Sequence, residues 1–120
     1  MFAAHYKLNN LTVFLDFNGL QIDGDITEVM NPTPFDAKFE AFGWNVIKID
    51  AHNFNEIEAA LNQAEASDKP TLVLAKSIKG RGVSFMENQA GWHGTAPNQE
   101  QYEQAISELD AHIKEIGGEA

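Results

Sequence analysis

Short apolar runs alternate with longer amphipathic segments along the whole chain. The runs at residues 12–16, 44–50 and 71–75 are rich in β-branched and aromatic residues, and they therefore predict strands. The first run is apolar on both faces, which favours a buried strand of a parallel sheet. The alternation predicts an α/β fold in which about three parallel strands alternate with helices.

The amphipathic segments predict helices, because their apolar residues recur at a spacing of three or four. A short helix over residues 2–8 comes first, and a second over 35–42 follows two prolines. A third helix over 53–67 begins at Asn53, which can cap it with Glu56 in the capping-box position. The one-sided apolar residues of the second and third helices are Phe35, Phe39, Phe42, Phe54, Ile57, Leu61 and Ala64.

The last part of the chain divides into a loop and a helix. Residues 77–97 carry several glycines and predict a long functional loop rather than a regular element. Residues 98–116 predict a closing helix that ends at Gly117-Gly118. Its expected apolar face comprises Tyr102, Ala105, Ile106, Leu109 and Ile113.

The composition is that of one globular domain spanning residues 1–120. The formal net charge of −10 argues against nucleic acid and anionic membranes as partners. Without cysteine the chain forms no disulfide or Cys-ligated zinc site, which fits a reducing compartment. No apolar run approaches the roughly 20 residues of a membrane span, and the start lacks secretory features, so we expect a soluble cytoplasmic protein.

Polar side chains follow the predicted strands, at the edge where parallel sheets bind their ligands. Asn18 and Asp23 lie in the stretch LDFNGLQIDG and offer the oxygen atoms that Mg²⁺ prefers. Asn, Asp and Gly are also ordinary turn-forming residues. The spacing alone therefore leaves a magnesium site and a plain turn as alternatives.

The predicted loop holds further candidates for ligand binding. Its SIKGRG stretch places glycines around an arginine beside Lys76 and Lys79, which suits a phosphate, although solvated surface lysines are the alternative. His93 lies between a tryptophan and a glycine and can exchange a proton near neutral pH. A lone loop histidine is nevertheless often incidental to function.

Four blocks of the sequence are informative together: HYKLNNLTVFLDFNGLQIDG, FEAFGWNVIKIDAHN, DKPTLVLAKSIKGRGVSFMEN and GWHGTAPN. In this order they resemble the thiamine-diphosphate domain of transketolase, in particular the amino-terminal subunit of bacterial split transketolases. The blocks cover nearly the whole chain. The resemblance implies a partial thiamine-diphosphate-binding fold, namely the carboxyl-terminal part of that domain.

The same resemblance assigns roles to particular residues. It implies that the side-chain oxygen of Asn18 and the backbone carbonyl of Leu20 ligate Mg²⁺, with Gly19 letting the backbone turn toward the ion. Lys79 matches a family lysine close to thiamine diphosphate, with Lys76 as a second choice. His93 matches the family histidine that meets both diphosphate and substrate, and it is the catalytic candidate.

The sequence also departs from the family pattern. The magnesium motif of the family opens with Gly-Asp-Gly, which has no counterpart in these 120 residues, and the pyrimidine-binding domain is not represented. We therefore expect the isolated chain to bind thiamine diphosphate and Mg²⁺ weakly and to need complementary transketolase chains. An incomplete parallel sheet leaves an open edge, which predicts self-association into a homo-oligomer.

The resemblance implies that the assembled enzyme transfers a two-carbon ketol unit between sugar phosphates, in the pentose phosphate pathway. One alternative is a related enzyme with the same domain, such as 1-deoxyxylulose-5-phosphate synthase or dihydroxyacetone synthase. The other is a non-catalytic truncated or excised fragment that folds and associates without turnover.

Overall fold

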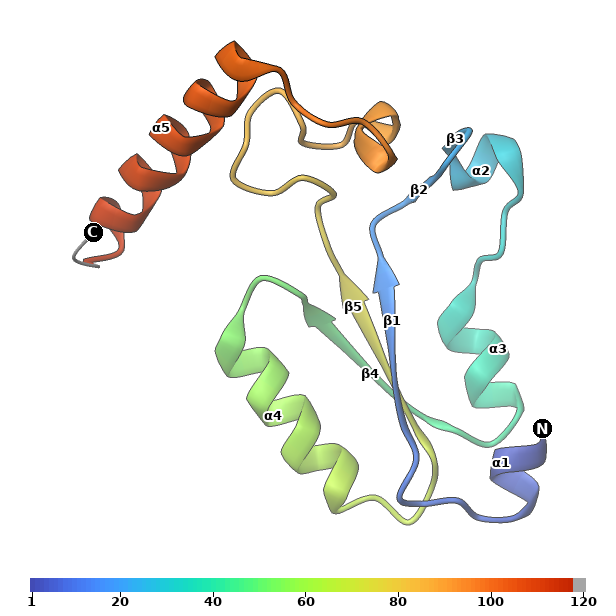
Figure 1. The fold of residues 1–120 in the computed structure, drawn as a ribbon. Coiled ribbons are helices and arrows are strands. Elements are labelled where there is room, and N and C mark those ends of the chain that lie inside the picture. The colour runs from blue at the N-terminus through green and yellow to red at the C-terminus, as the bar shows by residue number, and fades with distance from the viewer. Residues whose placement is uncertain (118–120) are drawn as a thin grey trace. The chain divides into compact units, whose positions relative to one another are not determined.

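The computed structural model describes residues 1–117 and divides into two compact units (Figure 1). The first, here called the sheet unit, comprises residues 1–18 and 30–77. The second, called the loop unit, comprises residues 19–29 and the chain from residue 78 onward. Each unit is built by different interactions and is described by itself.

Three parallel strands form the centre of the sheet unit. They are β1 (Thr12–Phe17), β4 (Asn45–Asp50) and β5 (Thr71–Lys76), in the order β1-β5-β4. Ala75 lies opposite Asp16 on one side and Ile49 on the other, so all three strands end at the same edge. The α/β fold with three parallel strands is confirmed, and each predicted strand is within a residue of its observed bounds.

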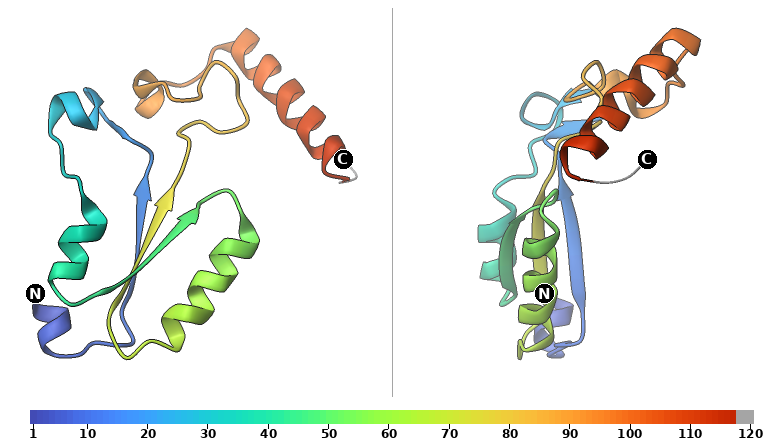
Figure 2. Two further views of the ribbon diagram at one scale, coloured as in Figure 1. Left: turned by 180° about the vertical axis from the view of Figure 1, so that it is seen from behind. Right: turned by 90° about the vertical axis from the view of Figure 1, so that its left-hand side faces the viewer.

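The core of the sheet unit lies between the sheet and α4 (Phe54–Glu65). Ala60 of α4 packs in one buried cluster with Ile49, Val73 and Ala75. Helix α3 (Phe35–Ala41) serves the opposite face, since its Asp36 forms an ion pair with Lys48. Lys48 and Ile49 point to opposite faces because side chains alternate along a strand. In the left-hand view of Figure 2, α3 and α4 lie on either side of the strands.

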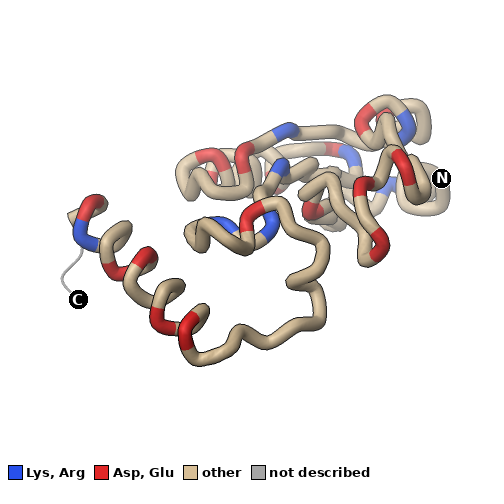
Figure 3. Tube along the Cα trace, turned by 90° about the horizontal axis from the view of Figure 1, so that it is seen from above, with Lys and Arg blue, Asp and Glu red and all other residues tan. Residues whose placement is uncertain are grey.

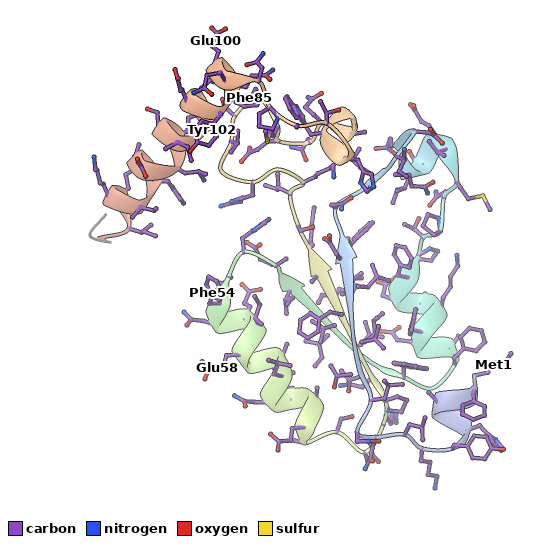
Figure 4. All side chains as sticks on the ribbon, in the orientation of Figure 1. Met1, Phe54, Glu58, Phe85, Glu100 and Tyr102 are labelled. Atoms are coloured by element: carbon purple, nitrogen blue, oxygen red, sulfur yellow. The ribbon has the colours of Figure 1, made fainter. Side chains whose placement is uncertain are left out.

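Some expectations for the helices are wrong in detail. The buried positions of α4 are Ala60 and Ala64, whereas Phe54 is 84% exposed (Figure 4) and Leu61 47% exposed. The small alanines let the helix approach the sheet closely, which a leucine at the contact would prevent.

Helix ends also differ from the pattern. Helix α1 (Phe2–His5) is shorter than the predicted helix over residues 2–8. Asn53 caps α4 as predicted, accepting bonds from the amides of Asn55 and Glu56. The Glu56 carboxylate, however, accepts from the Asn53 side-chain amide and from the Asp50 amide, so the expected capping box is wrong.

The loop unit begins with a small hairpin that the hydrophobic pattern does not predict. Strands β2 (Leu20–Gln21) and β3 (Gly24–Asp25) pair antiparallel, and α2 (Ile26–Val29) follows. Two-residue strands are too short to show a period. Residues 77–97 also include a short 3-10 helix, η1 (Ala90–His93), where no regular element is predicted.

Helix α5 (Gln99–Glu115) closes the described chain, and Gly118 of the predicted ending lies outside the described residues. Asn98 and Gln101 form a reciprocal capping box at its start. Ala105 is buried, while the other residues of its apolar face stay at least one-third exposed. Acidic residues recur along the helix (Figure 3). Within residues 1–117, no helix is long and apolar enough to cross a membrane.

Candidate cofactor site

Asn18 follows the last residue of β1, in the sheet unit, at the edge where the three strands end. Its side-chain nitrogen Nδ2 donates to Oδ2 of Asp16 over 3.4 Å. Residues two apart on a strand share a face, so this bond follows from the backbone conformation. In this arrangement the nitrogen of the Asn18 amide faces Asp16.

Asp16 also connects two strands that are far apart in the sequence. The hydroxyl of Ser77 donates to the other carboxylate oxygen of Asp16, Oδ1. The Ser77 amide donates to the carbonyl of Phe17 over 3.3 Å, which continues the β1–β5 pairing by one residue. Ser77 is therefore held beside Asp16 by both its backbone and its side chain.

Lys76, the second-choice cofactor contact, is the last residue of β5 in the same unit. Its side chain is exposed, and its carbonyl accepts from the Ala51 amide over 2.9 Å. The backbone of Lys76 is thus bonded at the edge of the sheet, while its side chain extends to solvent.

Gly19 and Leu20 begin the hairpin of the loop unit. Gly19 has a φ of +78°, and no atom lies within 4 Å of the place a Cβ would take, so its backbone conformation, rather than space, favours glycine. Its carbonyl accepts from the Ile26 amide over 3.1 Å. Leu20 pairs with Asp25 across the hairpin. Asp23 lies at the exposed turn between the strands, as the plain-turn alternative predicts.

Asp25 closes this hairpin onto α2. Its Oδ1 accepts from the Thr27 hydroxyl over 2.6 Å and from the Thr27 amide over 2.7 Å. These two bonds, the hydroxyl first, lower the pKa of Asp25. The segment that carries Leu20 is therefore held by a charged, hydrogen-bonded carboxylate.

Lys79 lies in a loop whose backbone bonds to itself. The Lys79 carbonyl accepts from the Asn88 amide over 2.9 Å. Gly80 has a φ of +74°, and a Cβ there would approach the Met86 carbonyl oxygen to 2.6 Å. Only glycine fits this position without a shift of the backbone. The loop thus has a defined shape next to Lys79.

His93 is the last residue of η1 and is exposed. The preceding Trp92 is anchored, since its ring nitrogen donates to the Phe85 carbonyl over 3.0 Å and the two ring centroids lie 5.3 Å apart. The anchored tryptophan fixes the backbone at His93 while leaving the imidazole accessible.

The structure thus brings Asn18 together with Asp16 and Ser77, while Gly19, Leu20, Lys79 and His93 belong to the loop unit. Sequence reasoning did not select Asp16, although its spacing of two from Asn18 was a usable signal. The amide oxygen of Asn18 and the Leu20 carbonyl are ligands of the kind Mg²⁺ takes. Among residues 1–117 no cluster of three or more His, Asp or Glu side chains is arranged to hold a metal. By donor type, each of these oxygens suits one position of a Mg²⁺ ligand set.

Comparison with known proteins identifies the family. Residues 1–115 match the family model described as transketolase, thiamine diphosphate binding domain. The chain belongs to this family. The resemblance inferred from the four sequence blocks is thereby confirmed.

Several curated transketolases are similar to the chain. A 6-deoxy-6-sulfo-D-fructose transketolase subunit of a Clostridium species is 40% identical over 111 residues, covering 92% of this chain and 40% of the relative. An apulose-4-phosphate transketolase subunit of Phocaeicola vulgatus is 36% identical, covering 97% of this chain and 42% of the relative. Human transketolase is 35% identical, and the match covers 94% of this chain and 18% of the human protein. The chain therefore spans less than half the length of these transketolases.

Solved transketolase structures have the same fold. The crystal structure of Campylobacter jejuni transketolase superposes with a TM-score of 0.84 at 32% identity, covering 91% of this chain and 17% of that one. A Pichia stipitis transketolase complex with sedoheptulose 7-phosphate gives a TM-score of 0.82 at 29% identity. This match covers 91% of this chain and 16% of the Pichia chain. The partial thiamine-diphosphate-binding fold is thus observed in both comparisons.

Proposed function

We propose that this chain contributes Mg²⁺ and thiamine diphosphate binding to a transketolase that transfers a two-carbon ketol unit between sugar phosphates. Family membership over residues 1–115 is the observation that carries the proposal. The relatives named as subunits support an enzyme divided over several polypeptides. The partners in this proposal are complementary transketolase chains.

Two oxygen atoms of this chain ligate the ion in the proposed site. The Asn18 amide oxygen is one ligand, and its orientation is supported by the bond from Nδ2 to Asp16. The Leu20 carbonyl is the other, at a hairpin that Gly19 and Asp25 stabilise. Both ligands are neutral, and Mg²⁺ gives up its water reluctantly. A polypeptide of these 120 residues alone is therefore expected to bind the cofactor weakly.

Lys79 and His93 serve the diphosphate and the substrate in this proposal. Lys79 offers an ammonium group, a point charge suited to phosphate oxygens, on a loop whose backbone is internally bonded. His93 is accessible and follows an anchored tryptophan, which suits a group that moves a proton at the substrate. The bound cofactor itself supplies the electron sink for carbon–carbon bond cleavage.

A complementation assay tests this function. The chain is combined with Campylobacter jejuni transketolase from which the matching segment is deleted, and ketol transfer from a ketose phosphate to an aldose phosphate is measured. We expect turnover with the unsubstituted chain and with the matched control His112→Ala, an exposed histidine of α5. His93→Ala should lower turnover by about 10²-fold or more. If neither Asn18→Ala nor His93→Ala lowered turnover, the roles proposed for these two residues would be wrong.

Calorimetry on the 120-residue chain separately tests the expectation that it binds thiamine diphosphate and Mg²⁺ weakly. Titration with thiamine diphosphate in the presence of Mg²⁺ should give little or no heat of binding, because the two ligands proposed for the ion are both neutral. Micromolar affinity in the isolated chain would overturn this expectation.

Self-association is a further part of the proposal. Among the described strands of the sheet unit, β1 pairs on one side only, with β5, and Phe14 of β1 is 47% exposed. An apolar edge strand of this kind invites pairing with another chain. Sedimentation should show a concentration-dependent oligomer, which Phe14→Lys weakens. A monomer at every concentration would exclude it.

A further inference from the structure

The Asp16 carboxylate occupies an unusual place for an exposed acid, because it connects two strand ends and the side chain of Asn18. One oxygen accepts from the Ser77 hydroxyl, and the other accepts from Nδ2 of Asn18. Asp16 and Ser77 are 61 positions apart in the sequence. Local turn formation therefore does not explain the contact.

Strand pairing brings these groups together. Asp16 lies opposite Ala75 in the parallel register, and Ser77, two residues further on, continues the same face of the sheet. The backbone bond from the Ser77 amide to the Phe17 carbonyl holds that register to the end of the strands. Asp16, Asn18 and Ser77 consequently face the same side of the sheet, all within the sheet unit.

The two bonds act on Asn18 in a directional way. An amide whose nitrogen donates to a fixed carboxylate must present its oxygen away from that carboxylate. A carboxylate that is itself held by Ser77 keeps this orientation better than one free to rotate. Charge-assisted bonds of this type are stronger than neutral ones.

We propose that Asp16 and Ser77 are positioning residues that orient the Asn18 amide for metal binding. The inference rests on the proposed role of Asn18 as a Mg²⁺ ligand. Neither Asp16 nor Ser77 contacts the ion in this proposal, and both act through Asn18. Groups that orient a metal ligand in this way typically change metal affinity by about 10–100-fold when they are removed.

Substitutions at Asp16 and Ser77 test the two side-chain hydrogen bonds of Asp16 separately. Asp16→Asn keeps an oxygen for the Ser77 hydroxyl, but it can place an amide nitrogen against the Asn18 nitrogen, where no bond forms. Ser77→Ala removes the hydroxyl and leaves the Asp16–Asn18 bond, whereas Ser77→Thr keeps the hydroxyl and should restore the arrangement. The matched control is Asp36→Asn, an acid of α3 whose partner, Lys48, is on the opposite face.

The first measurement needs no cofactor. In ¹⁵N-labelled full chain, the side-chain amide resonances of Asn18 should move in Asp16→Asn and Ser77→Ala, and should stay in place in Ser77→Thr and Asp36→Asn. The backbone amide of Ser77 reports whether the strand pairing is intact in each variant. Asn18 resonances that do not respond to Asp16→Asn, in a variant with intact pairing, would overturn the inference.

The second measurement uses the complemented enzyme described above. Asp16→Asn should raise the Mg²⁺ concentration for half-maximal turnover by about 10–100-fold. The rise should be smaller when Ca²⁺ replaces Mg²⁺, because Ca²⁺ tolerates irregular ligand geometry. Equal changes for both ions would indicate a general structural role and overturn the positioning role. A Mg²⁺ requirement unchanged by Asn18→Ala would instead overturn the proposed function itself.

Discussion

The two units place their candidate residues by different means. In the sheet unit, Asn18 is positioned by strands whose central member, β5, is fully buried from Thr71 to Ala75. In the loop unit, Lys79 is positioned by hydrogen bonds within a loop. The comparison indicates that one part of the candidate site depends on a hydrophobic core, and the other depends on polar groups and glycine conformations.

The helices of the two units also differ in how much apolar surface they bury. Helix α4 buries Ala60 almost completely against β4 and β5. Helix α5 buries only Ala105, and Tyr102 and Ile106 remain 52% and 41% exposed. The capping box and the links to the loop therefore stabilise α5 beside an apolar face that is only partly buried.

Removing a core side chain of β5 should give the largest effect. Leu72 is completely buried, and Leu72→Ala should lower the free energy of unfolding by about 2–5 kcal/mol, through lost transfer energy and the cavity left behind. The control Ile106→Ala on α5 should stay within about 0.5 kcal/mol. Urea unfolding followed by circular dichroism measures both variants. Equal losses would mean that α5 is as deeply packed as the sheet.

A glycine substitution in the loop should have the next largest effect. Gly80→Ala adds a left-handed backbone cost of about 1–2 kcal/mol to a close approach to Met86. The hydrogen exchange of the Asn88 amide, which donates to Lys79, should become faster. Gly91→Ala, a position with an open Cβ direction and no positive φ, serves as the control. Unchanged exchange in Gly80→Ala would show that the loop accommodates a side chain there.

The smallest effect concerns the link between the loop and α5. Glu108 of α5 accepts from the Ser84 amide over 2.6 Å, from the Ser84 hydroxyl over 2.7 Å and from Gln104 over 2.7 Å. These bonds, that of the Ser84 hydroxyl first, lower the pKa of Glu108 from its ordinary value of 4.5. Since the folded state has the lower pKa, the link contributes fully above pH 4.5 and is lost as the pH falls through the folded value.

The measurement follows the amide resonance of Ser84 during an acid titration from neutral pH. We expect it to move in the wild-type chain below pH 4.5, where Glu108 becomes protonated. In Glu108→Gln the movement should disappear, because glutamine does not titrate. Asp110→Asn on the same helix is the control and should leave the titration of Ser84 unchanged. A titration that persists in Glu108→Gln would assign the effect to another group.

Part of this structure could be predicted from single residues and their spacing. The three strands follow from apolar β-branched runs, and the cap at Asn53 follows from residue type. The buried face of α4 followed only in part. Ala64 is buried and Ile57 packs against the core as predicted, whereas Phe54 and Leu61 are exposed and Ala60 is buried instead. The sheet selected Ala60, the smaller side chain, which permits close packing.

The candidate site divides in the same way. Four blocks of the sequence in a fixed order identified the family, and the family model over residues 1–115 confirms it. The roles proposed for Asn18, Lys79 and His93 come from their positions within those blocks, because each residue type alone is also common in ordinary turns and loops. The partner of Asp16 was decided only by the tertiary structure. Ser77 reaches it through the parallel register of β1 and β5, and a register between strands so far apart in the sequence is set by packing of the whole sheet rather than by any local pattern.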